Sequence, residues 1–338
     1  MRAPAFADVV GHARARATLE AMWREGRVPQ ALLLCGPRGS GRRTLAQRFA
    51  ALLLGGDREG CVEVGTTASE RIRHGLHPDV LLIEREEGRR QLSMDAVRAL
   101  REEFSLKPQE AARRVAILAD ADRLSLETGN ALLKLLEEPP PTSHLILTVH
   151  SEAALMPTLL SRCVRLHLEP LPREELEHFL HARGYAGRDA ALAAAASDGA
   201  PGRALALAEA GFASVLLPAA VALLQPGPTP LATAAELFKA LDSEREKKNL
   251  ESTRERMRGL LEALQFLCGV AERGSVGIAA EGFSGEDMAA LPLDDVNAAR
   301  RELVLAAHVR LDANVAPLLV LEELQFELLE LVGPVPGS

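Results

Sequence analysis

Short apolar runs recur through the first half of the chain, and longer amphipathic stretches separate most of them. Five runs have this character, and they occupy residues 31–35, 80–84, 115–119, 145–149 and 164–168. Apolar runs of this length are typical of strands that are buried on both faces of a parallel sheet and connected by helices. We therefore predict an α/β fold built on a five-stranded parallel sheet.

A helical pattern separates the second run from the third. Ser93 is a residue type that caps helix N-termini, and Pro108 stands where the helix should end. Apolar residues between them recur at helical spacing, namely Met94, Val97, Leu100 and Phe104. We predict an amphipathic helix here, with this face packed on the core.

After residue 169 the strand pattern disappears, and Ala- and Leu-rich helical patterns continue through the rest of the chain. Pro170 and Pro172 mark the boundary. We predict three domains, with the α/β domain at 1–170, a small helical lid at 171–207 and an all-α domain at 208–338. A Pro- and Gly-rich break at 225–230 is expected to connect helices within the last domain. The final helix has a leucine face whose partner, its own domain or a neighbouring subunit, periodicity leaves open: Leu318, Leu321, Leu324 and Leu328.

The charge balance argues against an autonomous nucleic-acid-binding protein. Lys and Arg number 39 against 47 Asp and Glu, which gives a net charge of −8 across 338 residues. The four cysteines have no short C-x-x-C spacing, which suits a reducing compartment. Neither a leader sequence nor an apolar run of membrane-spanning length stands out. We expect a folded cytoplasmic protein whose contact with DNA, if any, is shared with partners.

The residues that follow the first apolar run have the glycine spacing of a phosphate-binding loop. Glycines let such a loop turn its backbone N–H groups toward an anion. A hydrolysing loop then needs a lysine for the β/γ-phosphates and, directly after it, a hydroxyl for Mg²⁺. Arginines stand at both positions here, and the hydroxyl comes one residue late. The candidate nucleotide-binding residues are Gly36, Gly39, Gly41, Arg42, Arg43 and Thr44. We predict a degenerate loop without hydrolysis of its own; the alternative is a Gly-rich loop at an ordinary strand–helix junction.

The third strand offers a second test of this interpretation. In ATPases with such a loop, that strand ends in two carboxylates, of which one orders the Mg²⁺ shell and the next polarises water. Ala119 stands at the first of these positions and Asp120 at the second. Losing the lysine, the hydroxyl and the metal-associated carboxylate removes most of the charge stabilisation for phosphoryl transfer. Asp120 and Asp122 are alternatively solvated loop or helix-capping residues.

Several longer motifs make the chain resemble a known family. The most specific are NALLKLLEEPP at 130–140 and SRC at 161–163, with supporting matches at FADVVG 6–11, RVPQA 27–31, HPD 77–79, GAPGRA 199–204 and DANV 312–315. With these motifs the chain resembles bacterial clamp-loader subunits of the AAA+ class, and most closely the delta-prime family of DNA polymerase III.

The resemblance implies a RecA-like AAA+ domain, a lid and a helical collar that assembles with tau/gamma and delta subunits. That complex, part of the polymerase III holoenzyme, loads the ring-shaped beta clamp onto primed DNA. Delta-prime members commonly do not hydrolyse ATP, so no cofactor is expected. Arg162 occupies the arginine-finger position of the SRC motif and would act on a neighbouring subunit's nucleotide. Without the family, an ion-pairing role for Arg162 would be favoured.

The chain also departs from its relatives. Many carry a four-cysteine zinc module in an interval where this chain has only Cys61, so zinc is not expected, although other possible ligands lie nearby: Asp57, Glu63, His74 and His77. Gly202 stands where hydrolysing relatives have a nucleotide-sensing arginine, with Arg203 one position later. Two alternatives stay open. One is an ATP-hydrolysing tau/gamma-type subunit, and the other is a bare anion site at Arg42 and Arg43.

Overall fold

The computed structural model describes residues 2–84, 92–104, 106–224, 250–275 and 296–332. By its internal contacts the chain separates into two compact units, one of residues 1–175 with 199–202 and one of 176–198 with 203–338. Each unit is described by itself below. The predicted break at 225–230 lies outside the described residues, and the three-domain division remains a prediction.

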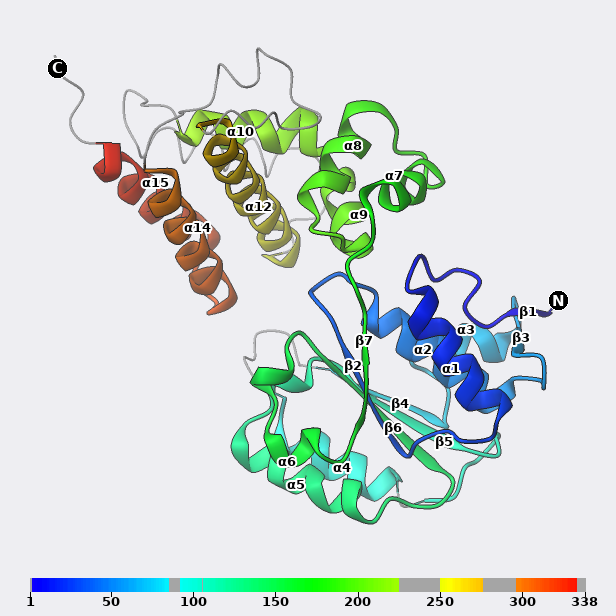
Figure 1. Ribbon diagram of the computed structural model, residues 1–338. Helices are drawn as coiled ribbons and strands as arrows, with labels where there is room; N and C mark the ends of the chain where they lie inside the picture. Colours follow the sequence, from blue (N-terminus) through cyan, green and yellow to red (C-terminus); the bar gives the residue numbers. More distant parts are fainter. Residues whose placement is uncertain (1, 85–91, 105, 225–249, 276–295, 333–338) are drawn as a thin grey trace, which may run out of the picture. The chain divides into compact units, whose positions relative to one another are not determined.

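The first unit is built on a parallel sheet that contains five strands within the described residues (Figure 1). Its strands, in the order in which they lie side by side, are β4 (Val80–Ile83), β5 (Arg114–Leu118), β6 (Ser143–Val149), β2 (Ala31–Cys35) and β7 (Val164–His167). All five predicted runs therefore form strands. Two further short strands, β1 (Arg2–Pro4) and β3 (Cys61–Glu63), pair antiparallel beside the sheet.

Helices cover both faces of the parallel sheet (Figure 1). Alternate residues of β2 show this directly, because Leu32 and Leu34 belong to one buried cluster while Leu33 and Cys35 belong to the other. The elements around the sheet are α1 (Ala13–Arg24), α2 (Arg42–Gly55), α3 (Thr67–Arg73), α4 (Met94–Phe104), η1 (Ala121–Arg123), α5 (Leu126–Glu137), η2 (Glu152–Ala154) and α6 (Pro157–Leu160). This arrangement confirms the predicted α/β class.

Helix α4 matches the sequence expectation closely. The Ser93 hydroxyl accepts the backbone N–H of Ala96 at 3.1 Å, which caps the first turn. Val97, Leu100 and Phe104 are buried in the cluster beneath the helix. The helical period of the apolar positions therefore placed the core face correctly.

In the described residues every element after Leu168 is helical, which confirms the change of class predicted near residue 169. These elements are α7 (Arg173–His181), α8 (Gly187–Ala196), α9 (Pro201–Glu209), the π-helical turn η3 (Phe212–Leu216), α10 (Leu217–Leu224), α12 (Leu250–Ser275), α14 (Asn297–Asp312) and α15 (Pro317–Val332). Helix α12 packs against α10 and α14, and α14 packs against α15.

The leucine face of the last helix is part of the second unit's own core. Leu321, Leu324 and Leu328 are buried, whereas Leu318 is half-buried. In the part of the chain that is described, no single helix has the length and apolar character to cross a membrane. Two consecutive helical segments, Pro201–Glu209 and Phe212–Leu224, together have the length and apolar composition of a membrane span, but the chain bends by 60° between them.

Candidate functional site

The glycine-rich segment is a strand–loop–helix junction, because β2 ends at Cys35 and α2 begins at Arg42. Gly39 and Gly41 have φ values of 77° and 88°, in the left-handed region that glycine adopts without a Cβ penalty. A Cβ on Gly36 would lie 2.8 Å from the Ser40 hydroxyl oxygen and 3.0 Å from the Cβ of Leu168. The three candidate glycines are therefore required by the loop's own geometry.

Two contacts brace this loop from outside it. The His12 ring, through Nε2, hydrogen-bonds the Ser40 carbonyl oxygen at 2.7 Å, and burial lowers the pKa of that imidazole. The backbone N–H of Gly202 donates to the Gly39 carbonyl oxygen at 2.8 Å. A Cβ on Gly202 would lie 3.0 Å from that same oxygen. Gly202 stands where hydrolysing relatives have a nucleotide-sensing arginine. It thus contacts the glycine-rich loop through its backbone.

Arg42 does not extend into solvent. Its side chain is 7% exposed, and its Nη2 atom lies 3.4 Å from the Asp120 Oδ1 atom. Burial lowers the pKa of the Arg42 guanidinium, while the charges of Asp120 and Asp122 oppose that shift. A guanidinium keeps its charge under these conditions. The cation at the lysine position is therefore engaged with a carboxylate of the same chain.

Arg43 is paired as well. Its Nη1 atom lies 2.7 Å from the Oε1 atom of Glu84, which directly follows the edge strand β4. The next residue, Thr44, is exposed on the first turn of α2. Both arginines of the candidate anion site are thus neutralised locally, which weakens the hypothesis of a bare phosphate site.

The carboxylates after β5 form a small network with a histidine. His150 Nδ1 lies 2.8 Å from Asp122 Oδ2 and 3.8 Å from Asp120 Oδ1. Burial raises the pKa of the Asp122 carboxyl, but the hydrogen bond and charge of His150, together with the charge of Arg42, outweigh burial and the net pKa is lowered. The backbone N–H of Asp120 donates to the Thr148 hydroxyl at 3.0 Å.

The helix-capping interpretation of Asp120 is wrong. The residue precedes η1 with φ 51°, and its side chain makes no capping hydrogen bond there. Asp120 instead pairs with Arg42 across the edge of the sheet. The sequence analysis assigned no role at this edge to Glu84, the partner of Arg43, or to His150. Both follow the ends of parallel strands, and such ends meet at one edge of a sheet.

Arg162 lies in the turn between α6 and β7. Its Nη1 atom donates to the Thr158 carbonyl oxygen at 2.9 Å, and its Nη2 atom to Glu137 Oε1 at 2.7 Å. Its side chain is 36% exposed. Glu137 is the last residue of α5, so the two most specific motifs, NALLKLLEEPP and SRC, meet at this ion pair.

The neighbouring Cys163 has a different role from Arg162. It packs against the cluster beneath α4, α5 and α6, and burial raises the pKa of its thiol to about 11. A thiol with such a pKa is protonated and acts as a small apolar side chain. The SRC turn therefore anchors its cysteine in the core while its arginine remains accessible.

The HPD motif organises the core rather than a reactive site. The Asp79 carboxylate is fully buried and accepts the backbone N–H groups of residues 109, 110 and 111 at 2.7 to 2.8 Å. The buried Arg114 guanidinium lies 3.4 Å away. Burial raises the pKa of the Asp79 carboxyl, but the three backbone N–H groups and Arg114 outweigh burial and lower it.

Arg203 belongs to the second unit. It pairs with Asp198 at 2.5 Å and with Glu262 at 3.0 Å. Burial lowers the pKa of its guanidinium, but these two carboxylates outweigh that effect and raise it. The described contacts of this side chain are thus ion pairs within its own unit.

Of the possible zinc ligands near Cys61, Asp57, His74 and His77 have other partners. Asp57 Oδ1 accepts the backbone N–H groups of Glu59 and Cys61, and Asp57 Oδ2 pairs with Arg2. Among the described residues, two groups of three side chains have the proximity that a metal ion needs. They are Asp120, Asp122 and His150, and Cys35, Glu152 and His167. Neither includes Cys61, and the first lies against the Arg42 guanidinium.

The residues of the glycine-rich loop and of the turn after β5 do not fit a site for Mg·ATP hydrolysis. The buried cation at the lysine position is held by Asp120, and Ala119 offers no oxygen for Mg²⁺. Gly39 and Gly41 keep the positive φ values of a glycine loop, while the charged side chains around the loop pair with one another. The lysine and the metal-associated carboxylate that hydrolysing loops use have no counterpart in this sequence.

Residues 11–172 match the family model described as DNA polymerase III, delta subunit. This part of the chain is similar to that family. The match includes the loop, the acidic strand end and both specific motifs, and it confirms the resemblance inferred from them.

Several relatives carry related names. A DNA polymerase III subunit delta' from Pseudomonas aeruginosa is 37% identical over 45% of this chain and 48% of its own length. The delta' subunit of Escherichia coli is 34% identical over 56% of this chain and 57% of its own length. A tau subunit from Salmonella typhimurium is 31% identical over 63% of this chain and 34% of its own length. The chain spans about half the length of the delta' relatives that it matches.

Proposed function

We propose that the chain is a delta-prime-type subunit of a DNA polymerase III clamp loader and does not hydrolyse ATP itself. In this role it assembles with tau/gamma and delta subunits and helps to load the beta sliding clamp onto primed DNA. The delta-subunit family match and the delta' relatives support the assignment to this complex.

The observation that carries the non-hydrolysing part is the contact between Arg42 and Asp120. A hydrolysing loop needs a cation directed at the γ-phosphate and a carboxylate directed at Mg²⁺ and water. Here the cation and the one retained carboxylate are directed at each other. Ala119 and the arginine at position 43 remove the remaining metal-binding groups.

Arg162 supplies the subunit's contribution to hydrolysis, as an arginine finger for a neighbouring tau/gamma subunit. Its guanidinium is exposed and held by one carboxylate, Glu137, so it can exchange that partner for a γ-phosphate. An exposed ion pair of this kind contributes only about 0–1 kcal/mol, which makes the exchange inexpensive. A permanently charged planar fork suits the three equatorial oxygens of a transferring phosphoryl group.

The decisive experiment measures DNA-stimulated ATP turnover in a reconstituted complex of this chain with its tau/gamma and delta subunits. A trans arginine is worth about 10³–10⁵ in kcat at the site that it serves. With Arg162→Ala, turnover at that one site should disappear and total turnover should fall by the site's share. The matched control is Arg98→Ala, which removes an exposed surface cation paired with Asp95. Unchanged turnover with Arg162→Ala would exclude the finger.

A second candidate is an ATP-hydrolysing subunit of tau/gamma type. The tau relative covers 63% of this chain, Gly39 and Gly41 keep positive φ values, and Gly36 keeps a position that a Cβ would crowd. Purified chain with ATP and Mg²⁺ distinguishes the two. Turnover that requires Mg²⁺ and is lost with Gly41→Val would favour the tau/gamma type and overturn the first proposal.

A further inference from the structure

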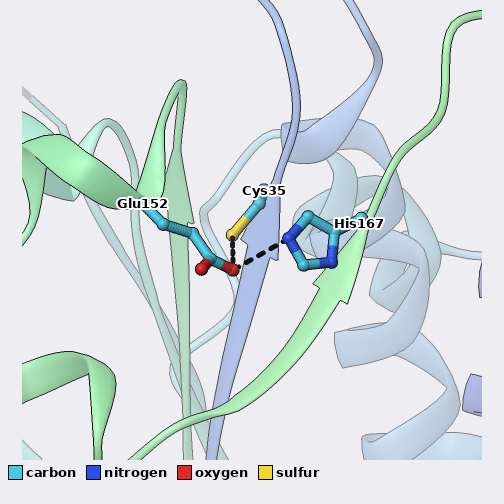
Figure 2. A group of neighbouring side chains, drawn as sticks. All are labelled: Cys35, Glu152 and His167. Atoms are coloured by element: carbon cyan, nitrogen blue, oxygen red, sulfur yellow. Dashed lines mark hydrogen bonds and ion pairs between the residues drawn. The ribbon is translucent and has the colours of Figure 1, made fainter.

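Three side chains of metal-binding type meet at the carboxyl edge of the sheet, beside the glycine-rich loop but outside the network just described. Cys35 ends β2 and His167 ends β7, and these residues are register partners on adjacent parallel strands. Their side chains therefore lie on the same face of the sheet. Glu152 begins η2, shortly after β6, the strand on the other side of β2. Figure 2 shows the three side chains converging from these separate elements.

The ligand atoms of the three side chains lie close together. Cys35 Sγ lies 3.5 Å from Glu152 Oε1, and His167 Nε2 lies 2.8 Å from the same oxygen (Figure 2). All three ligand atoms lie within 4.8 Å of one another. We propose that Cys35, Glu152 and His167 form a binding site for one divalent metal ion of the zinc type.

Tetrahedral geometry supports the assignment. With zinc bonds of about 2.3 Å to sulfur and about 2.1 Å to nitrogen and oxygen, the S···O separation is about 3.6 Å and the N···O separation about 3.4 Å. The first value matches the observed 3.5 Å. The second requires the 2.8 Å contact between His167 and Glu152 to open by about 0.6 Å. The His167 side chain is 64% exposed, so its ring can turn without disturbing the core.

The donor set also selects the class of metal. Thiolate and imidazole favour zinc and its transition-metal neighbours over Mg²⁺ or Ca²⁺, which prefer oxygen ligands. One thiolate and one carboxylate neutralise a divalent charge at the edge of an apolar cluster. Three protein ligands leave the fourth position to water.

Glu152 can bind the ion through one carboxylate oxygen while Arg165 holds the other. Its Oε1 atom faces Cys35 and His167, while its Oε2 atom lies 3.3 Å from Arg165 Nη1. A ligating carboxylate is commonly held by a hydrogen bond to its second oxygen, which fixes its orientation. Arg165 provides that contact from β7, two residues before His167.

Binding is coupled to release of a proton. Burial and the neighbouring Glu152 raise the pKa of the Cys35 thiol to about 12, so the sulfur is protonated at neutral pH. On metal binding the S–H bond breaks, the S–metal bond forms, and the proton leaves to solvent. His167 enters as the neutral imidazole and Glu152 as the carboxylate.

The test is a titration of the full, reduced, chelator-treated chain with Co²⁺, followed by competition with Zn²⁺. We expect one equivalent to bind with a near-ultraviolet thiolate-to-cobalt band, tetrahedral visible bands and release of about one proton. Cys35→Ser should abolish the near-ultraviolet band. His167→Ala and Glu152→Gln should each weaken binding at least tenfold. Cys61→Ser and Cys163→Ser are the matched controls and should leave the spectrum unchanged.

A thermal measurement keeps the proposal testable if Cys35→Ser folds poorly. Zn²⁺ should raise the Tm of the unsubstituted chain but not that of His167→Ala, which alters an exposed side chain. The proposal is overturned if no thiolate-to-cobalt band appears, if the band survives Cys35→Ser, or if only Cys61→Ser removes it. None of these outcomes bears on ATP turnover, so the proposed function is tested separately.

Discussion

The Nη2 atom of Arg42 lies 3.4 Å from the Oδ1 atom of Asp120, at the edge of the sheet where the glycine-rich loop and the carboxyl end of β5 lie. The two residues are far apart in sequence and occupy positions that serve nucleotide in hydrolysing relatives. Their contact holds the Arg42 guanidinium and the Asp120 carboxylate against each other within the chain. Each charge is thereby balanced by the other.

This pairing predicts how nucleotide affinity changes when the lysine and the hydroxyl of a hydrolysing loop are restored. In Arg42→Lys/Arg43→Thr the lysine and the hydroxyl return, and charge-assisted hydrogen bonds of about 1.5–3 kcal/mol become available to phosphate. We expect ATP affinity to rise at least tenfold while turnover stays at background, because Ala119 still offers no metal ligand. Fluorescence anisotropy of labelled ATP measures the first effect and phosphate release the second. Hydrolysis by this double variant would show that the carboxylate defect is unimportant.

The ion pair between Arg162 and Glu137 offers a way to test whether Arg162 is an arginine finger or only a structural residue. If Arg162 acts on a neighbour's nucleotide, Glu137→Gln releases it and complex turnover should be maintained or raised. If Arg162 serves only to pair with Glu137, Glu137→Gln should reproduce the effect of Arg162→Ala. Arg162→Lys should lose most turnover as well, because an ammonium lacks the planar fork. Steady-state turnover of the three reconstituted complexes distinguishes these cases.

Asp79 predicts a large and pH-dependent contribution to stability. Asp79→Asn leaves the buried Arg114 guanidinium without its counter-charge, which should lower the free energy of unfolding by about 3–5 kcal/mol. The exposed pair of Asp8 with Arg48 is the control, and Asp8→Asn should cost below about 1 kcal/mol. Urea denaturation followed by circular dichroism measures both.

The sign of the pH dependence follows from the lowered pKa of Asp79. Its stabilisation is fully present above the unfolded-state value of about 3.9 and is lost as pH falls through the lower, folded-state value. The acid-induced loss of stability below about pH 4 should therefore be shallower in Asp79→Asn than in the unsubstituted chain. Parallel curves for the two proteins would contradict this account of Asp79.

Two glycines with positive φ offer a matched test of backbone strain. Gly41 and Gly199 have φ values of 88° and 79°, but only Gly199 is crowded. A Cβ on Gly199 would lie 2.4 Å from the Pro170 Cβ and 2.8 Å from the Leu171 backbone nitrogen. Gly41→Ala should cost about 1–2 kcal/mol for φ alone. Gly199→Ala should cost about 1–3 kcal/mol more because of overpacking. Equal losses in denaturation would show that the crowding is relieved.

Much of the fold was accessible from the local pattern. The three central strands, β2, β5 and β6, are buried along their whole length, so their mostly apolar runs are a signal that needs no knowledge of their neighbours. The edge strands β4 and β7 are partly exposed, but their short apolar runs also marked them correctly. Helix α4 was correct because Ser93 and the spacing of its apolar residues act within a few turns. The motifs that carry the family resemblance are also contiguous stretches of sequence, and the family match confirms the resemblance.

The contacts of the candidate site were not accessible in the same way. The sequence by itself determined which chemical groups are present: arginines in place of lysine and hydroxyl, alanine in place of a metal ligand, and an arginine in the SRC motif. Only the tertiary structure decided their partners. Arg42 meets Asp120, Arg43 meets Glu84, Arg162 meets Glu137, and Glu152 meets both Cys35 and His167. Parallel strands bring their carboxyl ends to one edge regardless of sequence separation. All these pairings except that of Arg162, which precedes β7, with Glu137, which precedes β6, join residues at or after such ends, so they depend on the strand order β4-β5-β6-β2-β7, which no local pattern contains.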